Sequence, residues 1–465
     1  MEIHIKNILR FLRSVNVMKP ADDNRPKGAE CMNRSVTMTR RQAGVLLAGI
    51  LVLAAVLRIC IAMLFLGKFD TQVYLGWARG VQDGFFNAYD GHIPNMDYPP
   101  LYLYPLKLIG MLLAIPGVGD YLPYEMLLIK LTPILCDLLT VAVLYFACRR
   151  RSVVFGLILA SVWAVNPASI FNCAVWGQTD TMMIFLVALC LWALDEDRPI
   201  LGAVLFAVAG LTKLQCLYFG PIVLFYFLRR KDWTMLLKAV GAGLATVAVV
   251  FAPFMIGAKS WTLIFDVYLG GYDLFPVINL NAFNFYGLGE LNWVTDTLSI
   301  FGGSPNGSGQ MVGGFTFSML STILLLLSLA FVCFLMLKGK RFSVWMGSLM
   351  LMQCLFMLTI RQHERYQIVV LILCLMAFLK ERDYRLFGLF CGVCIISFFN
   401  QALVFAKAFH PADPWVASFN QIQFVFSFFN VLLFFFTVYL CWEYAFGKPS
   451  WLKKTIAAHQ QNGKA

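Results

Sequence analysis

The sequence predicts an all-α polytopic membrane protein, a bundle of about 12 transmembrane helices. Of the 465 residues, 60% are apolar, 15% aromatic and only 13% charged, a composition that soluble proteins of this size do not have. The net charge of +12 comes from Lys and Arg gathered in short loops, which is the positive-inside pattern and not a nucleic-acid surface. Nearly all of the 13 Cys lie inside apolar runs, which indicates packing, not disulfides or metal binding.

Three regions follow along the chain. Residues 1–43 are predicted to be a basic cytoplasmic segment. They lack the pattern of a cleavable signal. Residues 44–445 form a single transmembrane domain, and residues 446–465 form a basic cytoplasmic tail. The first helix, Ala43 to Leu66, leads outward, and Arg58 within it is expected to be a snorkelling or paired structural residue.

The positions of Lys and Arg set the remaining crossings. If Leu101 to Ile115 crossed the membrane, the three arginines at 149–151 would fall outside, so this segment is predicted to lie in or dip into the outer interface. Two of the remaining intervals, 199–213 and 367–380, are short for a hydrocarbon core of about 30 Å, so these helices are expected to be broken or extended into loops. The predicted spans after the first are 124–148, 152–171, 181–195, 199–213, 214–228, 235–256, 312–337, 343–360, 367–380, 386–405 and 421–443.

This topology puts both termini in the cytoplasm and the polar motifs on the outer side. The long outer loop of about 257–311 then carries a single base, Lys259. In a prokaryote, the chain would be a multi-pass protein of the plasma (inner) membrane with its active site facing outward.

The first outer loop, FDTQVYLGWARGVQDGFFNAYDGHIPNMDYPPLYLY, carries two acids with different surroundings. Asp70 follows the first apolar run by four residues, so its carboxylate lies at the membrane boundary, partly desolvated, where it can act as a general base. Asp97 precedes Tyr98 and two prolines, which fix the direction of the next segment. The alternative is that both acids only cap interfacial helices.

Further polar groups are predicted on the same side. The motif WGQTD at 176–180 contributes Gln178 and Asp180, and a turn between two short spans contributes Lys213 and Gln215. The polar segment INLNAFNFYGL covers 278–288, and RQHERYQ at 361–367 contributes His363, Glu364 and Arg365. Inside the bundle, Lys130 and Asp137 lie seven residues apart on one helical face, and we expect them to form a structural pair.

These motifs, in this order over roughly residues 45–370, resemble those of the GT-C glycosyltransferases, the polytopic class that uses polyprenyl-phosphate sugars. The chain is similar to the dolichyl-phosphate-glucose-dependent glucosyltransferases, the GPI-anchor mannosyltransferases and their prokaryotic relatives. The resemblance is carried by the first-loop Asp70 in FDTQVYLGWA, DYPPLYLY at 97–104, NPASIFNCAVWGQTD at 166–180, GLTKLQCLYFGP at 210–221 and HERYQ at 363–367. The chain departs from the family where DYPPLTAY becomes DYPPLYLY, and its outer loop has no acidic cluster like an oligosaccharyltransferase metal site.

The resemblance implies a GT-C-like bundle whose long first outer loop contains interfacial helices. It implies an inverting hexosyltransferase, with a polyprenyl-phosphate sugar as donor and a glycan or glycolipid hydroxyl as acceptor at the outer face. Asp70 would be the catalytic base, with no cofactor and no metal ion. Donor or substrate binding would fall to Asp97, Tyr98, Gln178, Asp180, Lys213, Gln215, His363, Glu364 and Arg365.

Two other classes fit parts of the pattern. A transporter or flippase of lipid-linked sugars would also be polytopic and basic inside, but it would more often show paired halves or matching broken helices. A structural or assembly membrane protein would not need Asp70 and HERYQ together. The grouping of polar motifs on one face favours the transferase.

Overall fold

The computed structural model describes residues 38–67, 70–149, 152–270, 275–307 and 309–447. Most of the predicted N-terminal cytoplasmic segment and nearly all of the C-terminal tail lie outside these residues. The chain divides into two compact units, one of Met1–Leu57 with Leu138–Val165, the other of Arg58–Asp137 with Asn166–Ala465. All of the candidate site residues belong to the second unit.

The predicted class, a helical polytopic membrane protein, is confirmed. In the described part of the chain, six helices are long and apolar enough to cross a membrane, or seven if the broken pair around residues 164–167 counts as one span. The six are α2 (Arg40–Leu64), α5 (Leu122–Cys148), α11 (Trp233–Gly257), α13 (Phe317–Lys338), α16 (Tyr384–Phe409) and Pro414–Phe446, which comprises η8 (Pro414–Ser418) and α17 (Phe419–Phe446).

Other predicted spans are shorter helices. They are α8 (Asp180–Asp195), α9 (Pro199–Gly210), α10 (Gly220–Arg230), α14 (Val344–Leu358) and α15 (Val369–Glu381). The intervals that looked short in the sequence are therefore short helices, extended by the 3-10 turns η4 (Leu214–Phe219) and η7 (Tyr366–Ile368). These turns carry polar side chains, so the helix shortening coincides with the polar motifs.

The predicted span over 152–171 is broken into two helices, which pass together as one membrane span by length and composition. Helix α6 (Val153–Ala164) ends before Asn166, and a new helix, α7 (Pro167–Ile170), begins after it. Asn166 caps α7 by accepting hydrogen bonds from the backbone N–H of Ala168 and Ser169. Pro167 cannot donate to the preceding turn, so the Asn-Pro pair ends one helix and begins another.

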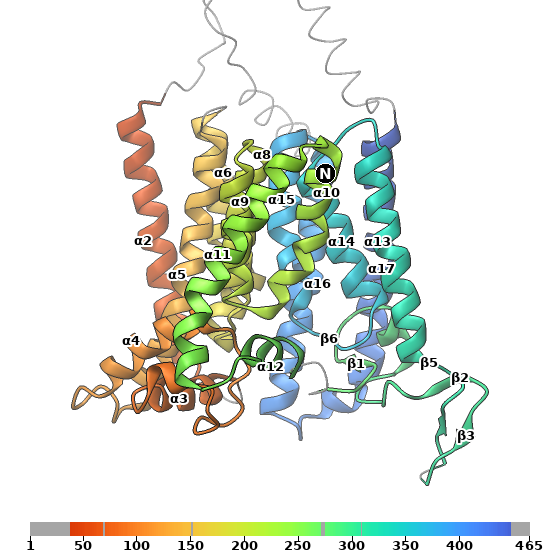
Figure 1. Ribbon diagram of the computed structural model, residues 1–465, viewed down its shortest axis with the longest axis horizontal. Coiled ribbons are helices and arrows are strands. Elements are labelled where there is room, and N and C mark those ends of the chain that lie inside the picture. The colour runs from red at the N-terminus through yellow and green to blue at the C-terminus, as the bar shows by residue number, and fades with distance from the viewer. Residues whose placement is uncertain (1–37, 68–69, 150–151, 271–274, 308, 448–465) are drawn as a thin grey trace, which may run out of the picture. The chain divides into compact units, whose positions relative to one another are not determined.

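In the second unit, α8, α9 and α11 pack in sequence, α13, α15 and α17 pack on α14, and α16 packs on α15 and α17. Figure 1 shows α3 (Asp70–Gly80), α4 (Leu103–Leu113) and α12 (Leu263–Leu269) at one end of these helices. The sequence predicted no strands, but short ones occur in the loops at that end. They are β1 (Asn279–Leu280) parallel to β6 (Gln362–His363), and the antiparallel pairs β2 (Ser299–Phe301) with β5 (Phe315–Thr316) and β3 (Ser304–Pro305) with β4 (Met311–Val312).

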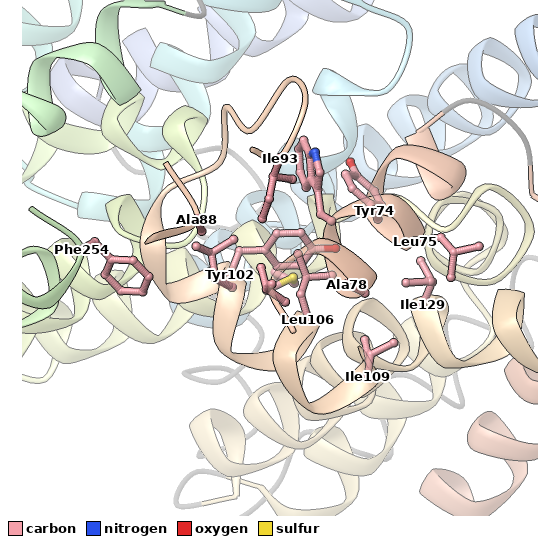
Figure 2. Packing of buried hydrophobic residues seen from close by; sticks show 14 of the residues in the cluster. Tyr74, Leu75, Ala78, Ala88, Ile93, Tyr102, Leu106, Ile109, Ile129 and Phe254 are labelled. Carbon is pink, nitrogen blue, oxygen red and sulfur yellow. The ribbon is translucent and has the colours of Figure 1, made fainter. Parts of the chain in front are cut away.

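The predicted first outer loop supplies most of a buried hydrophobic cluster, to which α5, α11 and α12 also contribute. Figure 2 shows Ala78 of α3 facing Leu106 and Ile109 of α4 in this cluster. The two helices approach closely because Gly110 has no side chain, and a Cβ there would lie 2.1 Å from the carbonyl oxygen of Ala78. Tyr104, on the opposite side of α4, is exposed together with Leu108 and Met111. This apolar stripe at helical spacing is what the predicted interfacial segment requires.

A buried ion pair, between Arg58 and Asp137, joins α2 to α5. Both side chains are fully buried, and the Arg58 Nε donates to the Asp137 carboxylate at 2.7 Å. The hydroxyl of Ser169 donates to the other carboxylate oxygen. Arg58 is therefore a paired structural residue, one of the two roles predicted for it.

The predicted pair of Lys130 with Asp137 is wrong. The Lys130 ammonium donates to the backbone carbonyls of Phe65 at 2.6 Å and Ala62 at 3.3 Å, where the C-terminus of α2 favours a positive charge. Seven residues put two side chains on one face but about 10.5 Å apart along the axis. Each of the two therefore takes a nearer partner from the α2 segment.

The ion pair yields a first prediction. Arg58→Met leaves the Asp137 carboxylate buried without its cation, so the free energy of unfolding should fall by about 3–5 kcal/mol. Thermal unfolding in nanodiscs measures the change, and the double variant Arg58→Met/Asp137→Asn should recover part of the loss. Arg40→Met, at an exposed position of the same helix, is the matched control. Equal stability of the Arg58 and Arg40 variants would contradict a stabilising pair.

Candidate active site

Asp180 is the point at which three of the polar motifs meet. It begins α8 and is fully buried. The ammonium of Lys213 donates to one of its carboxylate oxygens. The side-chain amide of Asn172 donates to the other oxygen at 3.0 Å, and the Nε of Arg365 lies 3.7 Å away from that oxygen. The WGQTD, TKLQ and HERYQ segments are thus brought together on one carboxylate.

The backbone before α8 has an unusual shape that directs Gln178. Residues Phe171–Trp176 form a π-helix, η3, which ends at Gly177 with φ of 79°. A Cβ on Gly177 would lie 2.7 Å from the Thr71 methyl group, so glycine permits both the left-handed turn and the close approach of α3. Gln178 consequently lies against the beginning of α3.

Asp70 is the first residue of α3 and is half-buried. Its carboxylate accepts a hydrogen bond from the side-chain Nε2 of Gln178. A carboxylate in the first turn is favoured by the helix dipole and the free backbone N–H groups there. The first outer loop and WGQTD therefore meet at the carboxylate that the sequence assigned as catalytic.

Tyr98 of the DYPP motif has its hydroxyl engaged by protein groups. That hydroxyl lies 2.8 Å from the Thr179 Oγ1 and 3.0 Å from the hydroxyl of Tyr74. The backbone N–H of Leu101 donates to the carbonyl of Leu211 at 2.9 Å, which ties the Pro-Pro turn to the segment before Lys213. These contacts give Tyr98 a positioning role between α3 and the start of α8.

Asp97 is partly buried and lies in the electric field of two other site residues. Burial raises the pKa of Asp97 to about 6, the charge of Asp70 adds to the rise, and the charge of Lys213 opposes it. An ordinary Asp carboxyl has a pKa near 3.8. Asp97 is therefore close enough to both charges to be influenced by them.

The HERYQ loop is fixed by a parallel bridge between β6 and β1. Within it, the guanidinium of Arg365 donates to Glu364 at 2.7 Å and lies 3.5 Å from the Nδ1 of His363. Burial alone would raise the pKa of Glu364, but the charge of Arg365 and the contact with His363 lower it to about 2. Burial and the charge of Arg365 lower the pKa of His363, so its imidazole is neutral near pH 7.

Arg365 keeps hydrogen-bonding capacity that the protein does not use. Its Nε is buried and has no hydrogen-bond partner within the described residues. The guanidinium lies over the rings of Trp176 at 5.9 Å and Tyr366 at 5.6 Å. Burial disfavours its charge, but the carboxylates of Glu364 and Asp70 outweigh this effect and raise the pKa of Arg365. A fixed cation with a spare donor is suited to an anionic ligand.

The remaining predicted residues, Gln215 and Lys213, contact other residues of the site. Gln215 donates to the hydroxyl of Tyr366 at 3.2 Å, so it supports the HERYQ loop from η4. Lys213 is almost fully buried and its ammonium is held by Asp180, which makes it a charge partner and leaves Arg365 as the cation with an open donor. In the described part of the chain, no three His, Cys, Asp or Glu side chains are grouped so as to hold a metal ion.

Two polar residues of this network were not selected from the sequence. Asn172 lies in the NPASIFNCAVWGQTD motif, and its Nδ2 also donates to Gln401 of α16 at 2.9 Å. Gln401 belongs to no motif, and the signal that could have found it is an amide inside an otherwise apolar helix. Both residues position the Asp180 carboxylate, directly or through a neighbour.

Comparison with known proteins places the chain near glycosyltransferases. A model of Glycosyltransferase family 87 matches residues 97–267, a little over a third of the chain. The match includes DYPP, WGQTD and Lys213, whereas Asp70 and HERYQ lie outside it. It confirms the predicted resemblance to glycosyltransferases.

Similarity to solved structures is low. The solved structure of ArnT from Cupriavidus metallidurans bound to undecaprenyl phosphate matches with 13% sequence identity and a TM-score of 0.41. That match covers 88% of this chain and 78% of the ArnT chain. No curated protein matches the sequence.

The surroundings of Asp97 yield a second prediction. Because its pKa is higher in the folded protein than in the unfolded chain, its contribution to stability is present below about pH 4 and is lost as the pH rises to about 6. Asp97→Asn does not titrate, so its unfolding temperature relative to wild type should increase between pH 4 and pH 6 and stay constant above. Thermal unfolding across this pH range measures the difference. A difference that does not vary with pH would contradict the raised pKa.

Proposed function

We propose that the protein is an inverting glycosyltransferase that moves a hexose from a polyprenyl-phosphate sugar to an acceptor hydroxyl on the outer face of the membrane. The observation that carries the proposal is the pairing, in one site, of a half-buried carboxylate, Asp70, with a fixed guanidinium, Arg365, that has an unused donor. The WGQTD segment links the two groups, because Gln178 donates to Asp70 and Asp180, two residues later, lies 3.7 Å from the Nε of Arg365. The family match supports glycosyl transfer as the reaction class.

Asp70 is the general base in this proposal. The acceptor hydroxyl oxygen attacks the anomeric carbon of the donor and gives its proton to the Asp70 carboxylate. Gln178 holds the carboxylate by donating to Oδ2, which leaves the other oxygen for the acceptor. Attack opposite to the leaving group forms the new C–O bond with inverted configuration.

Arg365 serves the leaving group. As the bond between the anomeric carbon and the phosphate oxygen breaks, its electron pair stays on the phosphate, which leaves as polyprenyl phosphate. The developing charge needs donors and cations but no proton, and Arg365 supplies both. Glu364 orients the guanidinium at 2.7 Å, and the neutral imidazole of His363 can donate a hydrogen bond to the phosphate.

The remaining groups shape the site. Asp180 and Lys213 neutralise each other and fix the loops. In this proposal, Asp97 serves the binding of the acceptor or donor. The apolar helices beside the site hold the polyprenyl chain of the donor. The surrounding bilayer is the second lipid partner of the enzyme. The acceptor is a glycan or glycolipid that reaches the same interface.

Turnover tests the proposal against a lipid-linked sugar transporter. The protein in nanodiscs is incubated with polyprenyl-phosphate mannose or polyprenyl-phosphate glucose and with glycoside acceptors, and released polyprenyl phosphate and the glycosylated product are followed by mass spectrometry. A glycosyltransferase forms both in equal amounts. Movement of intact donor between leaflets of liposomes without release of polyprenyl phosphate would identify a transporter.

The base assignment yields a third prediction. Asp70→Asn keeps the size of the side chain but cannot accept the proton, so turnover should fall by about 100-fold or more while donor binding persists. Asp97→Asn should reduce turnover less, or act on binding. Wild-type turnover in Asp70→Asn together with loss of turnover, but not of donor binding, in Asp97→Asn would reverse the two assignments.

The leaving-group assignment yields a fourth prediction. Arg365→Ala removes a donor to the departing phosphate, so turnover should fall by roughly 100-fold or more. Lys259→Ala, an exposed base of the outer loop, is the control and should leave turnover unchanged. Near-normal turnover of Arg365→Ala would give the HERYQ loop a structural role only.

A further inference from the structure

The amide of Gln178 is half used. Its side chain is fully buried and its Nε2 donates to Asp70, but its Oε1 is buried without a hydrogen-bond partner in the described part of the chain. The orientation of the amide follows from chemistry, because only its nitrogen can donate to a carboxylate. The unpaired atom is therefore an acceptor.

Among the described residues, the donors near Gln178 are engaged elsewhere. The hydroxyl of Thr179 is engaged with Tyr98, and the Asn172 amide and the Lys213 ammonium are engaged with Asp180. A buried acceptor without a donor is unfavourable and uncommon. Its position next to the proposed base points to a donor that arrives with the substrate.

We propose that Gln178 reads a second hydroxyl of the acceptor, next to the one that is glycosylated. This inference rests on the proposed function and adds the class of acceptor, a sugar or cyclitol that presents vicinal hydroxyl groups. The attacking hydroxyl donates its proton to Asp70, and its neighbour donates a hydrogen bond to the Oε1 of Gln178.

The geometry of a diol fits this division. The two oxygens of a gauche vicinal diol are about 2.8 Å apart, roughly one hydrogen-bond length. The Oε1 and Nε2 of one amide lie side by side, and Nε2 is bonded to Asp70, so the base and the unpaired Oε1 belong to neighbouring side chains, as two adjacent hydroxyls require. An acceptor that lacks the second hydroxyl leaves Oε1 unpaired and should react about 10- to 100-fold more slowly in kcat/KM.

The experiment measures a ratio of rates. Octyl mannoside, octyl glucoside and myo-inositol are offered with polyprenyl-phosphate mannose or polyprenyl-phosphate glucose, and each productive acceptor is compared with its monodeoxy analogues. For wild type, one deoxy analogue next to the glycosylated position should lose about 10- to 100-fold in kcat/KM. In Gln178→Met, which has no acceptor atom there, this ratio should fall to near one.

Two further variants separate reading of the acceptor from support of Asp70. Gln178→Glu keeps an acceptor oxygen and should keep the discrimination even though its overall rate falls. Gln82→Met changes an amide that donates to the backbone carbonyls of Ala78 and Lys107, away from Asp70, so it should leave the ratio unchanged. Discrimination that persists in Gln178→Met, or is absent in wild type, would overturn the inference. Absence of transfer with every donor and acceptor would instead overturn the proposed function.

Discussion

The site depends on the charge of Asp180, a carboxylate that is fully buried. Such a charge needs cations and hydrogen-bond donors of the protein in place of water. An isolated charge in an apolar interior is too unfavourable to persist. Lys213 and Asn172 bond it directly, and Arg365 lies beside it. Since these partners come from segments far apart in the sequence, satisfying one carboxylate draws their loops into a single polar site.

The predicted first outer loop reaches this site through hydrogen bonds and not through ion pairs. Tyr98 is placed by two hydroxyl groups, and Gln178 is placed by the left-handed turn at Gly177. The packing of α3 on α4 gives these contacts a rigid base. The two parts of the site differ in burial, because Asp180 is fully buried among its charge partners whereas Asp70 is half-buried.

Sequence reasoning found the polar motifs more readily than their partners. Asp70, Asp180 and Arg365 stand out because polar residues are rare beside apolar spans, and the placement of arginines predicted an interfacial position for α4. The partner of Lys130 could not be predicted, because helical spacing describes one helix and the competing carbonyls belong to another. Gln401 and the short strands were missed for a similar reason, since single amides and two-residue pairings depend on tertiary contacts.

The Arg58 pair has a consequence for biosynthesis. Arg58 precedes Asp137 by 79 residues, so α2 leaves the ribosome before the acid that neutralises its arginine has been made. Arg58 lies nearer the end of α2 (Arg40–Leu64) than its centre, so it disfavours insertion by less than the about 2.5–3.5 kcal/mol of a central arginine, and the apolar residues of α2 outweigh this cost. The helix can therefore enter the bilayer before Asp137 has been made, and the ion pair forms when α5 follows. Insertion of α2 is in this way independent of α5, whereas the stable contact of Arg58 with its partner requires Asp137 of α5.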